Sequence, residues 1–120
     1  MEPQAYELQA SLFQALSHPV RLRILDVLAR QEACVCHLTA VLGKPQPYVS
    51  QQLAVLRDMG LIADRREGTL IYYRVADDRL AGLLADGKAL VTAAAGREVT
   101  FPPLPEQVVA NCPCPRCSGE

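Results

Sequence analysis

Cysteine is the residue of this chain with the greatest capacity for chemistry, and it occurs five times in 120 residues. Cys34 and Cys36 form a Cys-Val-Cys pair, and Cys112, Cys114 and Cys117 lie close together near the C-terminal end. In the reducing cytosol, thiols favour metal binding or redox chemistry over structural disulfides, and the odd number argues against a complete disulfide framework. Thiolates prefer soft ions such as cadmium, lead and trivalent arsenic. We therefore expect a thiolate site for a soft ion.

The spacing of Cys34 and Cys36 raises a geometric question. Side chains two residues apart on a regular helix point about 200° apart around its axis. Both thiolates can face one ion only if the turn that carries them is unwound, and a disulfide between such close neighbours is expected to be strained. The pair opens a predicted helix over residues 35–42. Our hypothesis is that ion capture distorts the turn from Cys34 to His37 and displaces the next helix.

The C-terminal cysteines could complete the ligand set. Residues 96–120 contain five prolines and no helical period, which predicts an extended tail. From Gly96 to Cys112 such a tail spans up to ~50 Å, so it can reach the pair of its own chain or of a second subunit. Arg116 favours the thiolate form of its neighbours. Trivalent arsenic would take the pair and one tail thiolate, whereas cadmium or lead would take four thiolates. The three tail cysteines could instead form a separate site or bind zinc adventitiously.

The elements around the pair have the pattern of a helix-turn-helix. The helix over residues 35–42 ends at Gly43, and after a short link Pro47 starts a helix over residues 47–59. The second helix buries Val49, Leu53 and Leu56 and has a polar opposite face. That polar face comprises Tyr48, Ser50, Gln51, Gln52 and Arg57. Two short helices joined in this way, the second with a polar outer face, are typical of DNA-binding proteins.

A basic hairpin follows the helix-turn-helix. Apolar and polar residues alternate up to Val75, which predicts a strand, and Gly68 provides the permissive turn position. Arg65, Arg66 and Thr69 lie near the tip, where we expect contact with phosphates. A hairpin of this kind directly after a helix-turn-helix is a wing. Tyr73 is expected in the core and Tyr72 against the DNA backbone.

Helices at both ends of the domain are predicted to form a dimer. Residues 5–16 and 19–30 have helical periodicity, and Asp77 can cap a last long helix. The first and last helices each have a one-sided apolar stripe with a small core between them, so we expect them to pack against a second subunit. The predicted fold is mainly α with a β-hairpin wing, a dimeric winged helix-turn-helix over residues 1–95, followed by the tail.

Composition adds few constraints. The net charge is −1, although residues 43–75 hold five basic and three acidic side chains. No basic segment followed by an apolar run opens the sequence, and no apolar stretch approaches the ~20 residues that cross a bilayer. We therefore expect a cytoplasmic protein without a signal peptide or membrane contact.

Four segments together resemble the ArsR/SmtB family of metal-sensing repressors. The resemblance covers about residues 8–95 and is carried by LSHPVRLRIL (16–25), ACVCHL (33–38), VSQQLAVLRDMGL (49–61) and GTLIYYR (68–74). The Cys-Val-Cys box is similar to that of the arsenite- and cadmium-responsive branches. The Asp- and His-based zinc site known in the family is not expected, because the last helix contains no His.

The resemblance implies a homodimer that binds operator DNA and releases it when the inducing metal binds. By position, the recognition turn comprises Gln46, Tyr48, Ser50, Gln51 and Gln52. Many relatives have Arg and His near Gln51 and Gln52, so this chain departs from the usual pattern there. A Gln side chain can still bind an adenine edge with two hydrogen bonds, and Ser50 and Tyr48 are expected at phosphates.

Two other function classes are compatible with the cysteines. A redox-responsive repressor on the same scaffold would form a disulfide in place of binding an ion. A thiol enzyme would need a base beside its nucleophile, and only His37 is available near the pair. A metal carrier would not need the polar recognition face or the basic wing. The prediction is therefore a repressor and not an enzyme.

Overall fold

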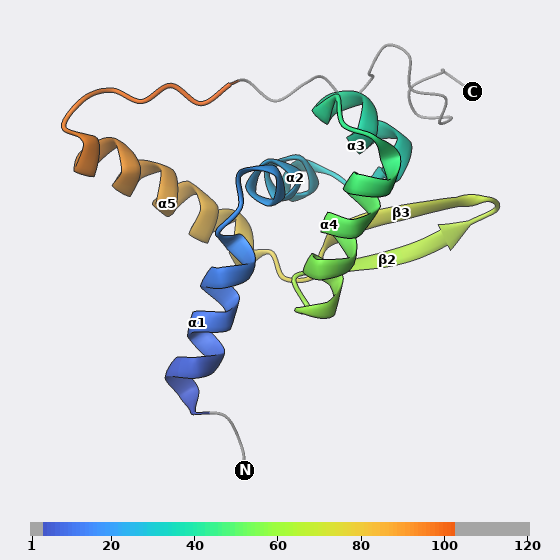
Figure 1. Ribbon diagram of the computed structural model, residues 1–120, viewed down its shortest axis with the longest axis horizontal. Helices are drawn as coiled ribbons and strands as arrows, with labels where there is room; N and C mark the ends of the chain where they lie inside the picture. The colour runs from blue at the N-terminus through green and yellow to red at the C-terminus, as the bar shows by residue number, and fades with distance from the viewer. Residues whose placement is uncertain (1–3, 103–120) are drawn as a thin grey trace.

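The computed structural model describes residues 4–102, and its elements follow the predicted order (Figure 1). The helices are α1 (Ala5–Leu16), α2 (Pro19–Arg30), α3 (Val35–Leu42), α4 (Gln46–Asp58) and α5 (Arg79–Ala95). The strands are β1 (Ala33–Cys34), β2 (Ile62–Glu67) and β3 (Leu70–Val75). The first three helices have the predicted bounds, and α4 begins and ends one residue earlier than predicted. The mainly helical fold with a hairpin wing is confirmed.

Local signals in the sequence set the helix ends. His18 caps α2 by accepting a hydrogen bond from the backbone N–H of Val20 at its Nδ1, 3.2 Å away, and Pro19 occupies the first turn. Gly43 ends α3 in the left-handed conformation, with φ of 63°, which a residue with a Cβ adopts less readily. The turn between α3 and α4 is therefore short, and the two helices form one unit.

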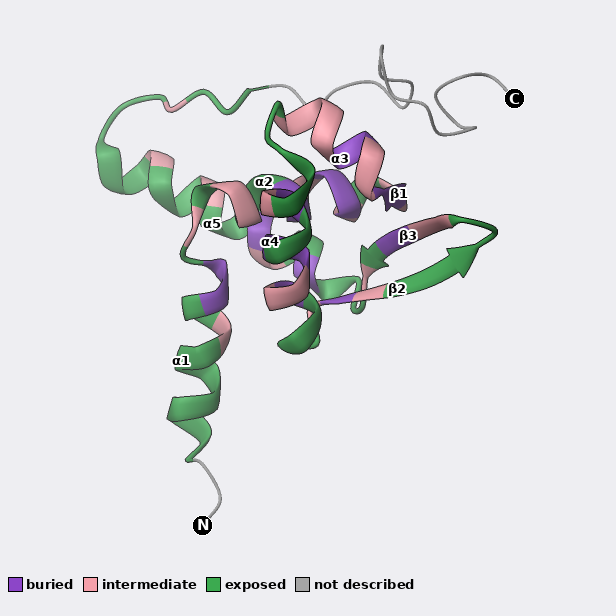
Figure 2. Cartoon of the chain, turned by 45° about the vertical axis from the view of Figure 1, so that its right-hand side comes forward, coloured by how far each residue is buried: buried purple, intermediate pink, exposed green. Residues whose placement is uncertain are grey.

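The core joins this unit to α2 and to the sheet. Ile24 and Leu25 of α2, Leu38 of α3, and Leu53 and Leu56 of α4 are almost completely buried. In Figure 2 the buried segments gather where α2, α3 and α4 meet the base of the hairpin, while the outer part of the hairpin is exposed. Burial of these side chains fixes α4 relative to the wing, so both present their outer surfaces as one body.

The sheet has a third strand that the sequence pattern did not predict. β1 is only two residues long and pairs antiparallel with β3, while β2 pairs with the other edge of β3. The strand order is therefore β1-β3-β2, with Ala33 opposite Tyr73 and Cys34 opposite Tyr72. As a result, the cysteine pair is attached to the wing through main-chain pairing.

The terminal helices leave apolar side chains uncovered. α1 and α5 both pack on α2 and extend away from the core (Figure 1). The large exposed apolar residues include Tyr6 and Phe13 of α1 and Leu90 and Val91 of α5. None of the helices within residues 4–102 has the length and apolar character required to cross a bilayer.

Asp77 caps α5 as predicted. Its Oδ1 accepts a hydrogen bond from the backbone N–H of Arg79 at 2.9 Å, and its carboxylate pairs with the Arg79 guanidinium at 2.6 Å. The hydrogen bonds from the Arg79 side chain and backbone lower the pKa of Asp77 from 3.8 to about 2. The charged carboxylate therefore stabilises the start of α5.

The Asp77→Asn variant is expected to show a small pH-dependent loss of stability. The amide oxygen retains a capping acceptor but not the charge. Because the pKa of Asp77 is depressed on folding, its stabilisation is present above pH 3.8 and disappears as the pH falls towards about 2. The difference in melting temperature between the two proteins should therefore be greatest near neutral pH and vanish near the lower value. Thermal unfolding followed by circular dichroism checks this, and a difference that is independent of pH contradicts it.

Candidate functional site

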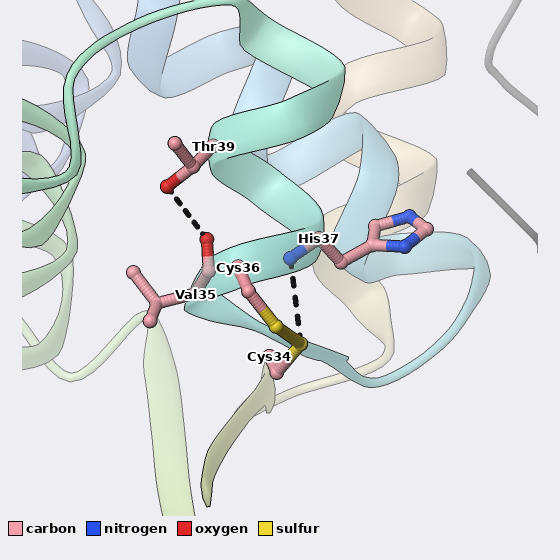
Figure 3. Close-up of a disulfide and its surroundings, with 5 residues drawn as sticks. All are labelled: Cys34, Val35, Cys36, His37 and Thr39. Carbon is pink, nitrogen blue, oxygen red and sulfur yellow. Dashed lines mark hydrogen bonds between the residues drawn. A yellow bond between two sulfur atoms is a disulfide. The ribbon is translucent and has the colours of Figure 1, made fainter. Parts of the chain in front are cut away.

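The sulfur atoms of Cys34 and Cys36 meet at the start of α3, where a disulfide links them (Figure 3). Cys34 is the last residue of β1 and the N-cap of α3, with an extended backbone, whereas Cys36 lies in the first helical turn. The 200° separation of a regular helix does not apply, because Cys34 is outside the helix. The expectation that the two sulfurs converge only after unwinding, and that their spacing disfavours a disulfide, is therefore wrong.

The two sulfurs have different surroundings. Cys34 is 1% exposed, and its Sγ accepts a hydrogen bond from the backbone N–H of His37 at 3.3 Å. Cys36 is only partly buried and is the cysteine that solvent can reach. The N-terminus of a helix has a partial positive charge, which favours negative charge on a capping sulfur. Any reaction at the Cys34 sulfur therefore also affects the cap of α3.

His37 is not a partner of the sulfur pair in this conformation. Its side chain is buried rather than partly exposed as expected, and its imidazole points away from the two sulfurs (Figure 3). Within residues 4–102 there is no group of three or more His, Cys, Asp or Glu side chains that could hold a metal ion. The described residues thus provide two soft ligands, and a further thiolate would have to come from elsewhere. Cys112, Cys114 and Cys117 lie outside the described residues.

The sulfur pair borders the wing. Cys34 and Tyr72 form a small buried cluster with Cys36, Ala40 and Leu70 at its edge. Tyr72 is 4% exposed, so the expectation that it contacts the DNA backbone is not supported, while Tyr73 lies in the main core as predicted. Both faces of β3 are covered here, because α3 and the cysteine pair lie over the face that carries Tyr72.

The predicted recognition residues do not all face outward. Gln46, Ser50 and Gln51 are exposed, and Tyr48 is partly buried. Gln52 is 7% exposed, and its Oε1 accepts a hydrogen bond from Arg21 Nε at 2.8 Å.

The prediction that Gln52 lies on the outer face of α4 is therefore wrong. Arg21 also donates to the carbonyl of Ala15, 3.2 Å from its Nη1. Gln52 thus helps to join α4 to α2 and to the end of α1, which is a positioning contact within the domain.

The wing residues differ in how they are held. Arg66 and Thr69 are exposed near the turn, and within residues 4–102 no ion pair involves Arg66. Arg65 is bound by two carboxylates: its Nη2 lies 2.6 Å from Glu32 and its Nη1 lies 2.7 Å from Glu67. Glu32, and then Glu67, raise the pKa of Arg65 above its ordinary value. Sequence reasoning missed Glu32, which no motif distinguishes.

Comparisons with known proteins agree with this geometry. Residues 18–64 match the model of the bacterial regulatory protein, arsR family. The chain is 45% identical over 74 residues to a transcriptional repressor SmtB homolog of Synechocystis, covering 62% of this chain and 56% of that protein. It is also 45% identical over 84 residues to the biofilm growth-associated repressor of Agrobacterium fabrum, covering 70% of this chain and 71% of the relative.

A solved structure has the same architecture. The homodimeric winged helix-turn-helix DNA-binding domain of Mb0332 from Mycobacterium bovis is 30% identical to this chain and superposes with a TM-score of 0.69. The match covers 84% of this chain and 100% of that domain. The curated relatives are repressors, and the fold is a DNA-binding one. The chain therefore belongs to the ArsR/SmtB family of transcriptional regulators and is a DNA-binding protein rather than an enzyme.

Proposed function

We propose that this chain is a cytoplasmic repressor whose affinity for operator DNA depends on the chemical state of Cys34 and Cys36. Capture of arsenite by the two thiolates releases the DNA. The observation that carries the proposal is the meeting of the two sulfurs at the N-cap of α3, the first helix of the helix-turn-helix. Two converging thiolates are a chelating pair for a soft ion.

The remaining thiolates come from the tail. Arsenite takes three thiolates, which the pair and one of Cys112, Cys114 and Cys117 supply, in the same chain or across the dimer. Cadmium or lead uses four, for which the five cysteines of the chain also suffice. Ligation at the Cys34 sulfur competes with the hydrogen bond from the His37 N–H, so it changes the first turn of α3. That turn is directly linked to the recognition helix α4.

A redox switch is the second candidate, and the disulfide itself favours it. Two thiols would transfer two electrons to a peroxide. They lose their two protons, form one S–S bond and yield two molecules of water. The product would have the same effect on α3 as a bound ion, because in both cases the two sulfurs are held together.

The DNA-binding surface comprises the exposed face of α4 and the tip of the wing. Gln46, Ser50 and Gln51 are exposed on α4, and Tyr48 flanks them. Arg66 and Thr69 extend this surface on the wing. Gln51 is placed to read a base edge, and the others are placed to bind phosphates. A homodimer through α1 and α5 would present two such surfaces to the two halves of an operator.

Gln51 and Gln52 are adjacent, and their alanine variants should separate DNA binding from stability. Gln51→Ala should weaken operator binding by about 1–3 kcal/mol, as for a lost base contact, with an unchanged melting temperature. Gln52→Ala removes the acceptor of Arg21 and should reduce the free energy of unfolding by about 1–2 kcal/mol. Denaturant unfolding and fluorescence anisotropy with operator DNA measure the two effects. Equal effects of both variants on stability would contradict this division.

A titration of the protein–DNA complex tests the proposed function. Full-length protein bound to its own upstream promoter is titrated with arsenite, antimonite, cadmium, lead and zinc in the presence of excess reductant. Release by arsenite supports the proposal, and release by cadmium or lead alone changes the inducer. Release only by peroxide, without reductant, establishes the redox switch instead. An unchanged complex under all of these conditions overturns both.

A further inference from the structure

Three side chains connect the sulfur pair to the outer edge of the wing. In the sheet, Cys34 of β1 lies directly opposite Tyr72 of β3, and Tyr72 lies directly opposite Arg65 of β2. Residues that are opposite each other on neighbouring strands project their side chains from the same face. Cys34, Tyr72 and Arg65 therefore form one row across the whole sheet.

Each step along this row is a direct contact. Cys34 packs against the buried Tyr72. The Arg65 guanidinium carbon lies 4.8 Å from the centre of the Tyr72 ring, within the range of a cation–π interaction. The row is connected a second time through Glu32, which is two residues before Cys34 and adjacent to β1. Both Glu32 carboxylate oxygens accept hydrogen bonds from Arg65, at 2.6 and 2.8 Å.

We propose that Arg65 is a switch residue that binds either Glu32 or an operator phosphate, depending on the state of the sulfur pair. The proposal rests on the proposed function above. When the sulfurs are held together, by an ion or by a bond, β1 stays fixed and Glu32 retains Arg65. When they are separate thiols, the start of α3 and β1 can adjust, and Arg65 becomes available to the phosphate.

The geometry makes Glu32 an effective competitor of DNA. Two parallel hydrogen bonds between a guanidinium and a carboxylate are the strong form of such a pair. Glu32 is 18% exposed, so water weakens this pair less than it weakens the contact of Arg65 with Glu67, which is 66% exposed. Arg66 has no comparable restraint among the described residues, so we expect it to contribute to DNA binding in both states.

The test compares two carboxylates that bind the same arginine. Glu32→Gln and the matched control Glu67→Gln each remove one ion pair with Arg65, but only Glu32 is adjacent to β1. For each full-length protein, operator affinity and its salt dependence are measured with reductant alone and with reductant plus arsenite. A thiol oxidant without reductant replaces arsenite in a second series. Circular dichroism confirms that each variant is folded.

In the wild type and in Glu67→Gln, joining the sulfurs should lower operator affinity and reduce the salt slope by about 0.9, the value for one lost phosphate contact. In Glu32→Gln, the slope in the joined state should stay at the thiol value, and the ratio of affinities should be smaller. The Arg65→Gln variant should have the lower slope in both states.

The outcomes separate the two proposals. If the wild type responds and Glu32→Gln responds by the same factor and slope, the switch role of Arg65 is overturned while the proposed function stands. If neither arsenite nor the oxidant changes the affinity of the wild type, the proposed function is overturned, and the switch with it.

Discussion

The Leu90→Glu variant is expected to be a monomer that binds operator DNA about 10²–10⁴-fold more weakly than the wild type. Leu90 is 69% exposed on α5, which is unusual for a leucine with Val91 beside it and further apolar side chains exposed on α1. An uncovered apolar surface of this kind marks an interaction site. The fold belongs to a family with a homodimeric structural relative, and α1 and α5 are where we propose the dimer to form.

The size of the effect follows from symmetry and from linked binding. In a two-fold interface each substitution occurs twice, so two carboxylates would have to be buried in the dimer. A monomer binds one half-site, and the gain from binding two connected half-sites is lost. Sedimentation velocity measures the oligomeric state, and anisotropy titrations measure the operator affinity.

Ala89→Glu is the matched control for this experiment. Ala89 is also exposed on α5, but it points about 100° away from Leu90 around the helix axis. Its variant should remain a dimer with operator affinity close to that of the wild type. A dimeric Leu90→Glu variant, or equal dissociation of both variants, would place the interface elsewhere.

Much of this fold follows from local sequence signals. Pro19, Gly43 and the apolar period define the bounds of α2 and α3, because helix ends depend on residues close to them. Strand β1 has no such signal. It comprises only Ala33 and Cys34, and it exists because β3 offers an edge for pairing. A contact between residues about forty positions apart is not evident from the pattern of either segment.

The errors at the candidate site have the same origin. Gln52 was placed on the outer face because it is polar, although it lies one position before Leu53 and is flanked on the helix surface by Val49 and Leu56. Position on the helix decided its burial, and Arg21 satisfies its amide oxygen. The contact between Glu32 and Arg65 depends on the sheet, so no reading of either residue alone could have predicted it.

Cys34→Ser and Cys36→Ser are each expected to raise the arsenite concentration for half-release of DNA at least about a hundredfold. Either variant leaves a single thiolate in the pair, and the advantage of a second ligand held at a high effective concentration is lost. Both variants should still bind the operator. Serine at position 34 is itself a good N-cap, so its hydroxyl can replace the sulfur as acceptor for the His37 N–H.

Cys34→Ala separates the cap from the ligand. Alanine removes the sulfur and the acceptor together, so this variant should lose the arsenite response and also about 1 kcal/mol of stability relative to Cys34→Ser. Chemical denaturation measures the second effect. Equal stability of the serine and alanine variants would mean that the capping sulfur does not support α3.

The tail cysteines give the remaining control. A full-length variant with Cys112→Ser, Cys114→Ser and Cys117→Ser retains the pair and removes every other thiol of the chain. If arsenite takes its third thiolate from the tail, this variant should need a higher arsenite concentration for release. Its response to an oxidant should be unchanged, because a disulfide needs only the two sulfurs that already meet at the start of α3. A wild-type arsenite response in this variant would exclude the tail from the sensor, and a loss of both responses would contradict a self-sufficient Cys34–Cys36 pair.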